Sequence, residues 1–563
     1  MSVASKIIKR IELPREDDSL THEELYLANY DLLPIPVENR TWGPWTYFLF
    51  WFAEGSSITS LTTAGTAVKN GLSWWEAWLA VIFSHVLVAC YMVMTGRPGA
   101  VYHVPFPVII RTSFGQWGSY FPFICRQIMT IIWSGVQAVS TGNCFYVMLH
   151  AIFPSIAHVH NPFNSQVTMT GGRLIGFACG WVVTTACCWV PFHKFQKLVI
   201  AKSAIMVFFI LVFFIWVLVK AHGGGTMLTK PSTVPKGETH GWLWISQFMI
   251  QGANQLTFAT NNADLTRYAA KPNNALWTQI GGYPIGSSII AFFGVFIISA
   301  SQVIYGAVLW DPIAILDGFL DASYDSKTRC GVFFLGLGFS FAQVTTMIFA
   351  NLIPAGNDTA ALVPRFIDVK RGAIICMILS FAITPWNLTR TSFAFTNYLN
   401  SYSVFLAGFI GIIACDYFVI RKGFYDIHEL FSGRKESMYY YTGGWNWRAF
   451  AAYFLTMIPF LPGFASICGA KNIPTGAIKL FDLGALIQTI LSALFYYVFC
   501  MISPPAGGIA TKWNEVEPGD DFAPRFYPDI DGISMDEKGD MEKGTANFSK
   551  VDVNVNSEVD QKP

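Results

Sequence analysis

Apolar stretches long enough to cross a bilayer recur from residue 45 to residue 502. A membrane-crossing helix needs about 20 mostly apolar residues, and backbone groups surrounded by lipid must be paired within the protein, which favours helices. The pattern predicts twelve spans, with these approximate limits: 45–68, 74–95, 120–147, 174–192, 199–220, 243–264, 279–306, 331–354, 373–389, 397–420, 449–467 and 482–502. The expected fold is therefore all-α and polytopic, with a transmembrane domain at 45–502.

The composition agrees with a membrane protein and excludes other classes. Of the 563 residues, 53% are hydrophobic and only 13% are charged, whereas a soluble domain has about 25% charged residues. The 16% aromatic content excludes general disorder, and a net charge of +1 gives no footprint for binding nucleic acid. The eleven cysteines have neither zinc-site nor disulfide-framework spacing, so no metal site is expected.

The charged residues concentrate outside the predicted membrane domain. Residues 1–44 form a polar N-terminal tail without the short apolar stretch of a signal peptide, so the first span is expected to remain in the mature protein. Residues 503–563 form an acidic tail that is expected to be disordered. The Lys and Arg residues of the connections favour the side that holds both termini, which predicts cytoplasmic termini. The tails could bind trafficking or ubiquitylation machinery, or be simply solvated.

Two of the predicted spans are interrupted by polar residues. The first contains Glu54, Gly55 and a Ser/Thr run that includes Ser57 and Thr59, and the sixth contains amides around Gln255. Helices broken at mid-membrane commonly line transporter sites, although hydroxyls and amides also join packed helices. Two interruptions five spans apart favour a site. They also suggest that five helices are repeated in inverted topology, followed by two further helices.

The third span would face this site. Trp133 and Gln137 lie four residues apart and so share one helix face. An indole offers a flat stacking surface, and an amide offers both a donor and an acceptor. This combination suits a planar, amide-bearing heterocycle, although a tryptophan in a membrane helix is often simply packed or interfacial.

Several short motifs in a fixed order make the sequence recognisable. They are Asn39-Arg-Thr-Trp42, Gly71-Leu-Ser-Trp74, Arg97-Pro-Gly-Ala-Val-Tyr102-His103, Trp133-x-x-x-Gln137, Asp264-Leu-Thr-Arg267-Tyr268, Ala342-Gln343, Ala350-Asn351, Asn357-Asp358, Val369-Lys370-Arg371-Gly372, Pro385-Trp386-Asn387, Cys415-Asp416-Tyr417, Gly444-Trp-Asn446-Trp447-Arg448 and Leu461-Pro462-Gly463. In this order the sequence resembles the nucleobase–cation symporter-1 family, in its fungal branch of uracil, allantoin, uridine and thiamine permeases. The resemblance implies a LeuT-like five-plus-five inverted repeat that works by alternating access in the plasma membrane.

The resemblance also implies roles for individual residues. Trp133 and Gln137 match the family's stacking indole and substrate amide, and Asn351 matches its substrate-bonding asparagine on the eighth helix. Thr345 and Thr346 match hydroxyls that hold sodium in bacterial relatives, but fungal members generally use protons, so proton coupling is expected ahead of sodium. No other cofactor is implied.

Three departures from the family pattern leave the substrate open. Ser57-Ile58-Thr59-Ser60-Leu61 replaces an Asn-x-Asn-Thr-Trp element, Gln255 replaces an aromatic platform that Phe258 could supply instead, and Met347 replaces an asparagine. Uracil, allantoin or a related purine, pyrimidine or hydantoin is the first expectation. A nucleoside or vitamin such as uridine, thiamine or nicotinamide riboside is the alternative.

Charged residues near the expected site supply candidates for coupling and gating. Glu54 is the predicted proton carrier, because desolvation would raise the pKa of its carboxyl towards neutrality, although a structural pairing with a hydroxyl or backbone donor is the alternative. Lys202 is expected to extend to the cytoplasmic interface. Asp264 and Arg267, near Arg126, form either an inner gate or a helix-end salt-bridge cluster.

The start of the tenth span supplies candidates for the outer gate, namely Tyr398, Asn400 and Tyr402. Three other classes stay open at this stage. A membrane enzyme would need a nucleophile or metal constellation, which the spacing does not supply. A channel would conduct without saturable accumulation. A non-transporting sensor derived from a carrier has no distinguishing residues.

Overall fold

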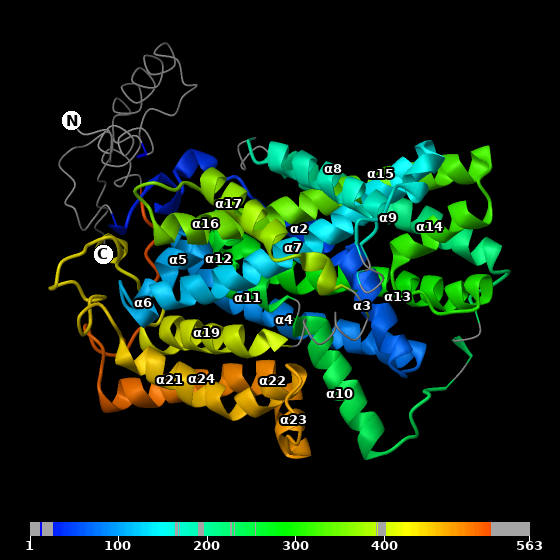
Figure 1. The fold of residues 1–563 in the computed structure, drawn as a ribbon. Helices are drawn as coiled ribbons and strands as arrows, with labels where there is room; N and C mark the ends of the chain where they lie inside the picture. The colour runs from blue at the N-terminus through cyan, green and yellow to red at the C-terminus, as the bar shows by residue number, and fades with distance from the viewer. Residues whose placement is uncertain are drawn as a thin grey trace, which may run out of the picture.

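The computed structural model describes residues 12–13, 26–163, 167, 169–189, 196–225, 228–229, 231–253, 255–389, 391 and 401–519. Within these ranges the regular structure is helical, apart from isolated bridges that pair Trp42 with Ala269 and Thr442 with Trp445. Every one of the twelve predicted spans falls on helix, which confirms the all-α polytopic fold class (Figure 1).

The helices that correspond to the first five spans are α2 (Pro44–Gly55) with α3 (Ile58–Lys69), α4 (Trp74–Tyr102), α7 (Tyr120–Ile152), α8 (Gly171–Cys187) and α9 (Gln196–Lys220). Those of the next five are α10 (Glu238–Ala253) with α11 (Leu256–Asn261) and α12 (Ala263–Thr266), α13 (Trp277–Tyr305), α15 (Ser326–Thr346) with the π-helix η8 (Met347–Leu352) and α16 (Ile353–Leu362), α17 (Val369–Ala382), and α19 (Ser403–Cys415) with the π-helix η10 (Asp416–Ile420). Those of the last two are α21 (Trp447–Met457) with η11 (Ile458–Phe460) and α22 (Leu461–Ile467), and α24 (Gly484–Ile502). Short helices form the connections: η2 (Tyr30–Leu32), η3 (Val37–Asn39), α5 (Phe106–Ile109), α6 (Arg111–Phe114), η4 (Pro154–His158), η7 (Pro272–Ala275), α14 (Pro312–Ala322), η9 (Pro385–Asn387), α20 (Ile427–Leu430) and α23 (Thr475–Asp482).

Six segments of the described chain are long and apolar enough to cross a membrane by themselves. They are Trp74–Tyr102, Lys197–Lys220, Pro272–Tyr305, Ser326–Leu362, Trp447–Ile467 and Gly484–Ile502. The remaining predicted spans correspond to shorter, interrupted or more polar helices. This uneven pattern is expected where several helices line a polar interior and do not all face lipid.

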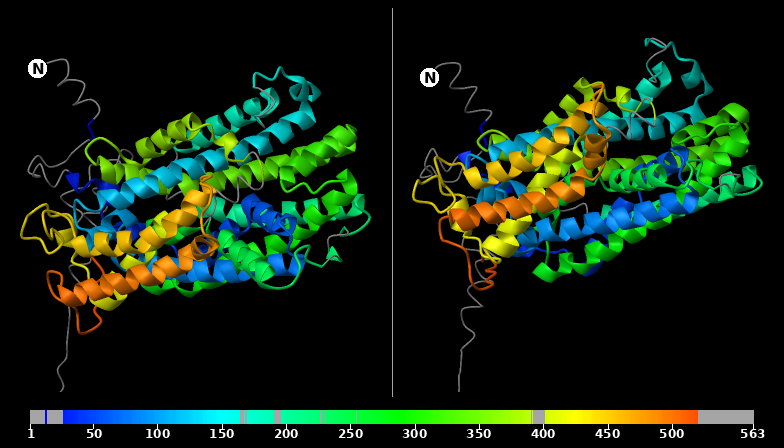
Figure 2. Two further views of the ribbon diagram at one scale, coloured as in Figure 1. Left: turned by 60° about the horizontal axis from the view of Figure 1, so that its bottom comes forward. Right: turned by 90° about the horizontal axis from the view of Figure 1, so that it is seen from below.

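The helices group into two packed bodies. In the first body, α2, α3, α4, α10–α12 and α13 contact one another, and in the second body, α7, α8 and α15–α17 do so. The helix α9 contacts both bodies, through α2 and α13 on one side and α15 on the other. The C-terminal helices α21 and α24 pack on α19 and lie together along one side of the bundle (Figures 1 and 2). A surface between two bodies of this kind can open and close without unfolding either body.

Both interruptions that the sequence predicts are present in the first body. The helix α2 ends at Gly55, and α3 begins at Ile58 after Ser57, whose backbone is extended. A side chain at Gly55 would begin 2.6 Å from the carbonyl oxygen of Tyr283, so glycine is required for this approach of α2 to α13. The second break separates α10, which ends at Ala253, from α11, which begins at Leu256.

The first and last described segments meet at one end of the bundle, here called the terminal end. Arg40 and Glu517 form an ion pair of 3.4 Å there, and Arg97 at the end of α4 pairs with Glu515. The ring of Trp513 stacks on that of Phe418. Residues 503–519 therefore lie against the transmembrane body, although the sequence assigned them to a disordered tail. Glu515 meets Arg97 of α4, and Glu517 meets Arg40 just before the first span, which explains this difference.

Candidate functional site

The predicted amide of the third span is paired with a second amide. Gln137 on α7 donates a 2.7 Å hydrogen bond from Nε2 to Oε1 of Gln343 on α15, and both side chains are buried. Among the described residues, Nε2 of Gln343 has no hydrogen-bond partner. Gln343 belongs to a motif that carries the family resemblance, but nothing in its sequence context distinguishes it from a packed amide, so sequence reasoning missed it as a site residue.

Two ring contacts involve the predicted aromatic residues. The Trp133 ring, one turn from Gln137 on α7, lies 6.5 Å from the ring of Tyr402, so a predicted stacking residue contacts a predicted gate residue. Phe258 on α11 makes an edge contact with Trp51, with ring centroids 5.4 Å apart. The other two gate candidates at the tenth span, Tyr398 and Asn400, lie outside the described residues.

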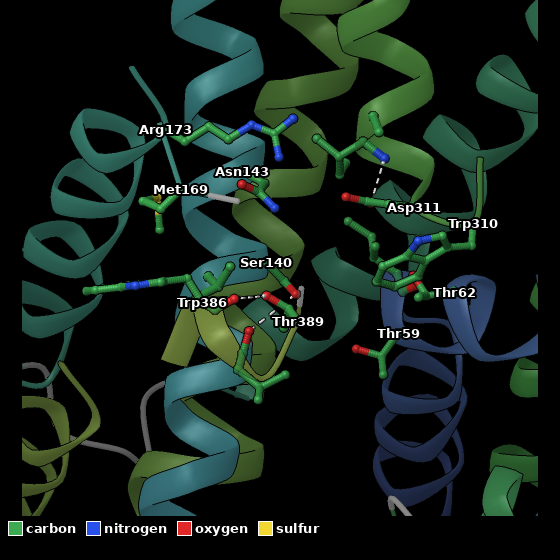
Figure 3. Close-up of a pocket in the computed structure, with 15 residues that line it drawn as sticks. Thr59, Thr62, Ser140, Asn143, Met169, Arg173, Trp310, Asp311, Trp386 and Thr389 are labelled. Carbon is green, nitrogen blue, oxygen red and sulfur yellow. Dashed lines mark hydrogen bonds between the residues drawn. The ribbon is translucent and has the colours of Figure 1, made fainter. Parts of the chain in front are cut away.

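A cavity of about 190 Å³ opens beside the break in the first span, on the side away from the terminal end. In Figure 3, Thr59 and Thr62 of α3 form one wall, and Ser140 and Asn143 of α7 form the facing wall. Ser140 lies only three residues beyond Gln137, so the cavity ends close to the amide pair. The cavity is also lined by the following residues: Ile58, Val136, Val139, Met169, Arg173, Trp310, Asp311, Ile313, Ala314, Trp386 and Thr389.

Two charged residues, Arg173 and Asp311, line this cavity. Arg173 lies 3.6 Å from Asp317, which also accepts a 2.8 Å hydrogen bond from Nδ1 of His150. Asp311, which caps α14 through the backbone N–H of Ile313, lies outside the spans. Burial raises the pKa of the Asp311 carboxyl, and the Arg173 guanidinium opposes this rise.

Ser57 has a local structural role at the break. Its hydroxyl accepts a 3.2 Å hydrogen bond from the backbone N–H of Ser60, which makes it the N-cap of α3. It also lies 3.1 Å from the hydroxyl of Ser60. Gln255 occupies the matching position before α11, but its side chain makes no cap hydrogen bond. Of these predicted substrate contacts, Ser57 is thus already engaged in capping, while Thr59 faces the cavity.

Glu54 forms a buried ion pair with Lys202. The two side chains are 4% and 1% exposed, and Nζ of Lys202 lies 2.5 Å from Oε1 of Glu54. The prediction that Lys202 extends to the interface is therefore wrong. The helix α9 packs against α2, which holds the ammonium beside the one carboxylate of the first span. Glu54 is structurally paired, as the alternative expected, but its partner is an ammonium.

The eighth-span candidates lie around a helix irregularity. Asn351 is within the π-helix η8 and donates a 3.6 Å hydrogen bond to the sulfur of Met347. Thr345 donates to the carbonyl of Phe341 at 2.9 Å, and Thr346 has no partner for its hydroxyl among the described residues. In the described part of the chain, no group of three or more His, Cys, Asp or Glu residues is arranged to hold a metal ion.

The predicted gate residues join the two bodies near the terminal end. Arg126 of α7 lies 4.0 Å from Asp264 of α12 and also pairs with Asp358 of α16. Arg267 donates 2.7 Å and 3.5 Å hydrogen bonds to the backbone oxygen of Asp31 and to Asn357. All these charged side chains except Asp31 are fully or nearly fully buried. The site is therefore closed at the terminal end, while a cavity remains at the opposite end.

Two helical bodies, two broken helices in the first of them, a buried ion pair at one break and closure at one end define a membrane transporter of the alternating-access type. Comparison with known proteins identifies its family. The family model described as "Permease for cytosine/purines, uracil, thiamine, allantoin" matches residues 34–487. This chain belongs to the nucleobase–cation symporter-1 family, as the sequence motifs indicated.

Similar sequences are fungal permeases. The uracil permease of Saccharomyces cerevisiae is 35% identical over 488 residues, which cover 86% of this chain and 77% of that protein. The allantoin permease of the same yeast is 34% identical over 509 residues, with coverage of 89% and 80%. An uncharacterized permease of Schizosaccharomyces pombe is 39% identical over 484 residues, with coverage of 86% and 82%. The chain is accordingly a permease and not an enzyme.

Solved structures confirm the fold. The nucleobase–cation symport-1 family transporter Mhp1, in a closed conformation with bromovinylhydantoin bound, matches with a TM-score of 0.65 at 19% identity. The match covers 85% of this chain and 97% of Mhp1. The inward-facing conformation of Mhp1 also matches with a TM-score of 0.65, at 17% identity, covering 85% of this chain and 95% of that one.

Proposed function

We propose that this protein is a proton-coupled symporter that carries a planar, amide-bearing heterocycle of the nucleobase type by alternating access. The observation that carries the proposal is the pairing of Gln137 with Gln343 one turn from Trp133, on the helices α7 and α15 of the second body. An aromatic plane beside amide donors and acceptors suits a flat ring with N–H and C=O groups. The uracil and allantoin permeases among its relatives support this substrate class.

The proposed substrate site comprises Trp133, Gln137, Asn351, Gln255, Phe258 and Thr59, with Ser57 holding the break. Tyr402, beside Trp133, is proposed as part of one gate, and Asp264 with Arg267 as the other. Tyr402 contacts Trp133 of the second body, and Asp264 and Arg267 connect the first body with the second. Because these charged contacts close the terminal end, substrate is proposed to reach the site first from the cavity end.

Proton coupling is proposed to use Glu54. The Glu54 carboxylate is removed from water, and the ammonium of Lys202 compensates its negative charge. A change of conformation that separates the two groups would leave the carboxylate unpaired and favour its protonation. The hydroxyls of Thr345 and Thr346 represent the sodium alternative.

The terminal end is proposed to face the cytoplasm and the protein to lie in the plasma membrane. The excess of Lys and Arg on that side supports the orientation. The tails remain candidate sites for trafficking or ubiquitylation machinery.

Uptake by a host that lacks its own uracil and allantoin permeases tests the proposal. Radiolabelled uracil, allantoin and hydantoin are offered at acidic and neutral pH, with and without a proton uncoupler, and with and without sodium. We expect saturable accumulation of at least one ring that the uncoupler abolishes and sodium does not affect. If accumulation requires sodium, the proposed coupling ion is wrong. If none of the rings is taken up, the proposed substrate class is wrong.

A second substrate class, nucleosides and vitamins, needs its own set of labelled compounds in this experiment. The uridine permease of Saccharomyces cerevisiae is 32% identical over 492 residues, and a thiamine transporter of that yeast is 31% identical over 507 residues. Labelled uridine, thiamine and nicotinamide riboside are therefore offered in parallel. Accumulation of one of these without any free ring would assign the chain to the nucleoside or vitamin carriers.

A further inference from the structure

The pair formed by Gln137 and Gln343 leaves a defined set of hydrogen-bonding groups for a ligand. A primary amide has one carbonyl oxygen and one NH2 group. When one amide donates to the other, the donor keeps a free carbonyl and the acceptor keeps a free NH2. This remains true whichever of the two glutamines donates. The pair therefore leaves at least one whole carbonyl group and one whole NH2 group for a ligand.

The free NH2 group of the pair is buried and needs a hydrogen-bond acceptor. Gln343 is 1% exposed, and no described residue accepts a hydrogen bond from its Nε2. A buried donor without an acceptor is unfavourable, and a ligand carbonyl at this point would remove that cost. The two glutamines are on α7 and α15, which pack within the same body, so their spacing is set by one rigid unit.

We infer that Gln343 is a specificity-determining residue that acts with Gln137 as a two-amide clamp for a cis-amide edge, in which a ring N–H and an adjacent ring C=O point the same way. The ligand N–H donates to the free glutamine carbonyl, and the ligand C=O accepts from the free NH2. Trp133, one turn along α7, provides the stacking plane for the same ring. This inference rests on the proposed function and narrows its substrates to cyclic imides and ureides, such as uracil and hydantoin.

The clamp also excludes particular compounds. A ring whose edge nitrogens carry methyl groups has no N–H to donate, and it would leave the glutamine carbonyl unpaired. A site built to hydrogen-bond a ligand group rejects analogues that lack the group far more strongly than an apolar pocket rejects a missing methyl. Thiamine lacks the cis-amide edge as well, and is expected to bind poorly.

The first test uses the unmodified protein. Uptake of the labelled ring that the protein accumulates is competed with uracil, 1-methyluracil, 3-methyluracil and 1,3-dimethyluracil, and with hydantoin against 1,3-dimethylhydantoin. We expect each dimethyl compound to compete at least 100-fold less well than its parent, and at least one monomethyluracil to compete well, because it keeps one complete edge. Equal competition by the dimethyl compounds overturns the clamp while leaving the transport function intact.

The second test uses Gln343→Met and Gln137→Met, since methionine has a similar length without a strong donor or acceptor. Each variant is expected to raise KM at least tenfold, and the double variant to raise it by less than the product of the single effects, because the two amides act together. Gln488→Met is the matched control. Gln488 is also fully buried, but it lies on α24, away from the site, so its variant should leave KM unchanged.

Thermal unfolding of each purified variant in detergent separates recognition from folding. A KM for Gln343→Met within twofold of the unmodified value, in a folded protein, overturns the role of Gln343. A failure of the unmodified protein to accumulate any ring overturns the proposed function, and with it the clamp. The competition series with methylated rings uses the unmodified protein. It therefore tests the clamp even if the Gln343→Met variant does not fold.

Discussion

Glu54 and Lys202 show how one contact can combine stability with coupling. Both charges are removed from water, and each depends on the other for compensation. Removing one partner of a buried ion pair commonly costs about 3–5 kcal/mol, because the remaining charge is left unpaired. Replacing both partners by uncharged groups of similar size costs much less.

The pair therefore predicts a pattern across three variants. We expect Glu54→Gln and Lys202→Met each to lower the amount of folded protein, and the double variant E54Q/K202M to recover it. The double variant should nevertheless lose uncoupler-sensitive accumulation, because no titratable group remains at the break. Fluorescence size-exclusion profiles measure folding, and uptake at two pH values measures coupling. Pumping by the double variant with normal pH dependence would show that the proton uses another group.

Sequence reasoning at the residue scale found one half of this pair. Glu54 is distinctive because it is the only carboxylate among the apolar residues of the first span. Its partner was missed, because a lysine near the start of a hydrophobic helix has the same sequence pattern whether it extends to the interface or turns inward. Only the packing of α9 against α2 decides between these positions. Gln343 was missed as a ligand residue for the same reason, since its partner is 206 positions away.

At the scale of helices, the break between α2 and α3 depends on the cap that Ser57 provides. Replacing an N-cap serine by alanine costs about 1 kcal/mol, whereas threonine can still accept the hydrogen bond. We expect Ser57→Ala to lower the melting temperature of the purified protein, and Ser57→Thr to retain most of it. Nanoscale differential scanning fluorimetry with and without substrate measures both effects.

The same two variants distinguish capping from substrate contact. If Ser57 acts through the cap, Ser57→Thr restores KM together with stability. A variant Ser57→Ala with unchanged stability and a raised KM would instead assign the hydroxyl directly to substrate. Thr59→Val is the matched comparison, because Thr59 faces the cavity and does not cap α3.

In the second body, α8 contacts α7 through a row of glycines. Gly172, Gly176 and Gly180 are four residues apart and share the face that packs on α7. A side chain at Gly176 would begin 2.6 Å from the carbonyl oxygen of Gly142, which is backbone and cannot easily move away. Small residues at this spacing allow membrane helices to approach closely, so that their backbones gain van der Waals contacts.

We expect Gly176→Val to reduce folded protein strongly, because overpacking within a tight helix pair costs about 1–3 kcal/mol or more. Val182→Leu, on the exposed face of the same helix, is the control and should fold normally. Expression and detergent stability of both variants measure the difference. A Gly176→Val protein as stable as the unmodified one would mean that α7 and α8 can separate without cost.

Helices were the part of the fold most readily predicted from sequence. The apolar pattern placed the twelve predicted spans on helices, although only six segments of the described chain are apolar enough to cross a membrane by themselves. Glycine with serine, threonine and amide residues located the two breaks. The π-helix η8 was not predicted, because a single-residue widening of a helix leaves no period in the apolar pattern. The contacts of residues 503–519 were also missed, since acidic composition alone indicates a solvated segment, and the cations that receive Glu515 and Glu517 are far away in sequence.

At the scale of the whole molecule, the structure is closed at the terminal end and hollow at the other. Two kinds of contact contribute to the closed end. Arg126 and Asp358 lie on α7 and α16, inside the second body, so their pair persists when the bodies move. Asp264 lies on α12 in the first body, and its contact with Arg126 at 4.0 Å joins the two bodies and breaks if the terminal end opens. A contact shifts a conformational equilibrium only when the two states differ in it.

Asp264→Asn is therefore expected to favour opening at the terminal end, whereas Asp358→Asn serves as a comparison that weakens a pair within one body. A loss of about 1.4 kcal/mol from the closed state alone raises the open-to-closed ratio tenfold. Hydrogen–deuterium exchange of the purified proteins measures this ratio through peptides that cover α5 and α11–α12. We expect faster exchange in these peptides for Asp264→Asn than for Asp358→Asn at equal thermal stability. Equal exchange in the two variants would mean that Asp264 only supports the fold and does not bias the transport cycle.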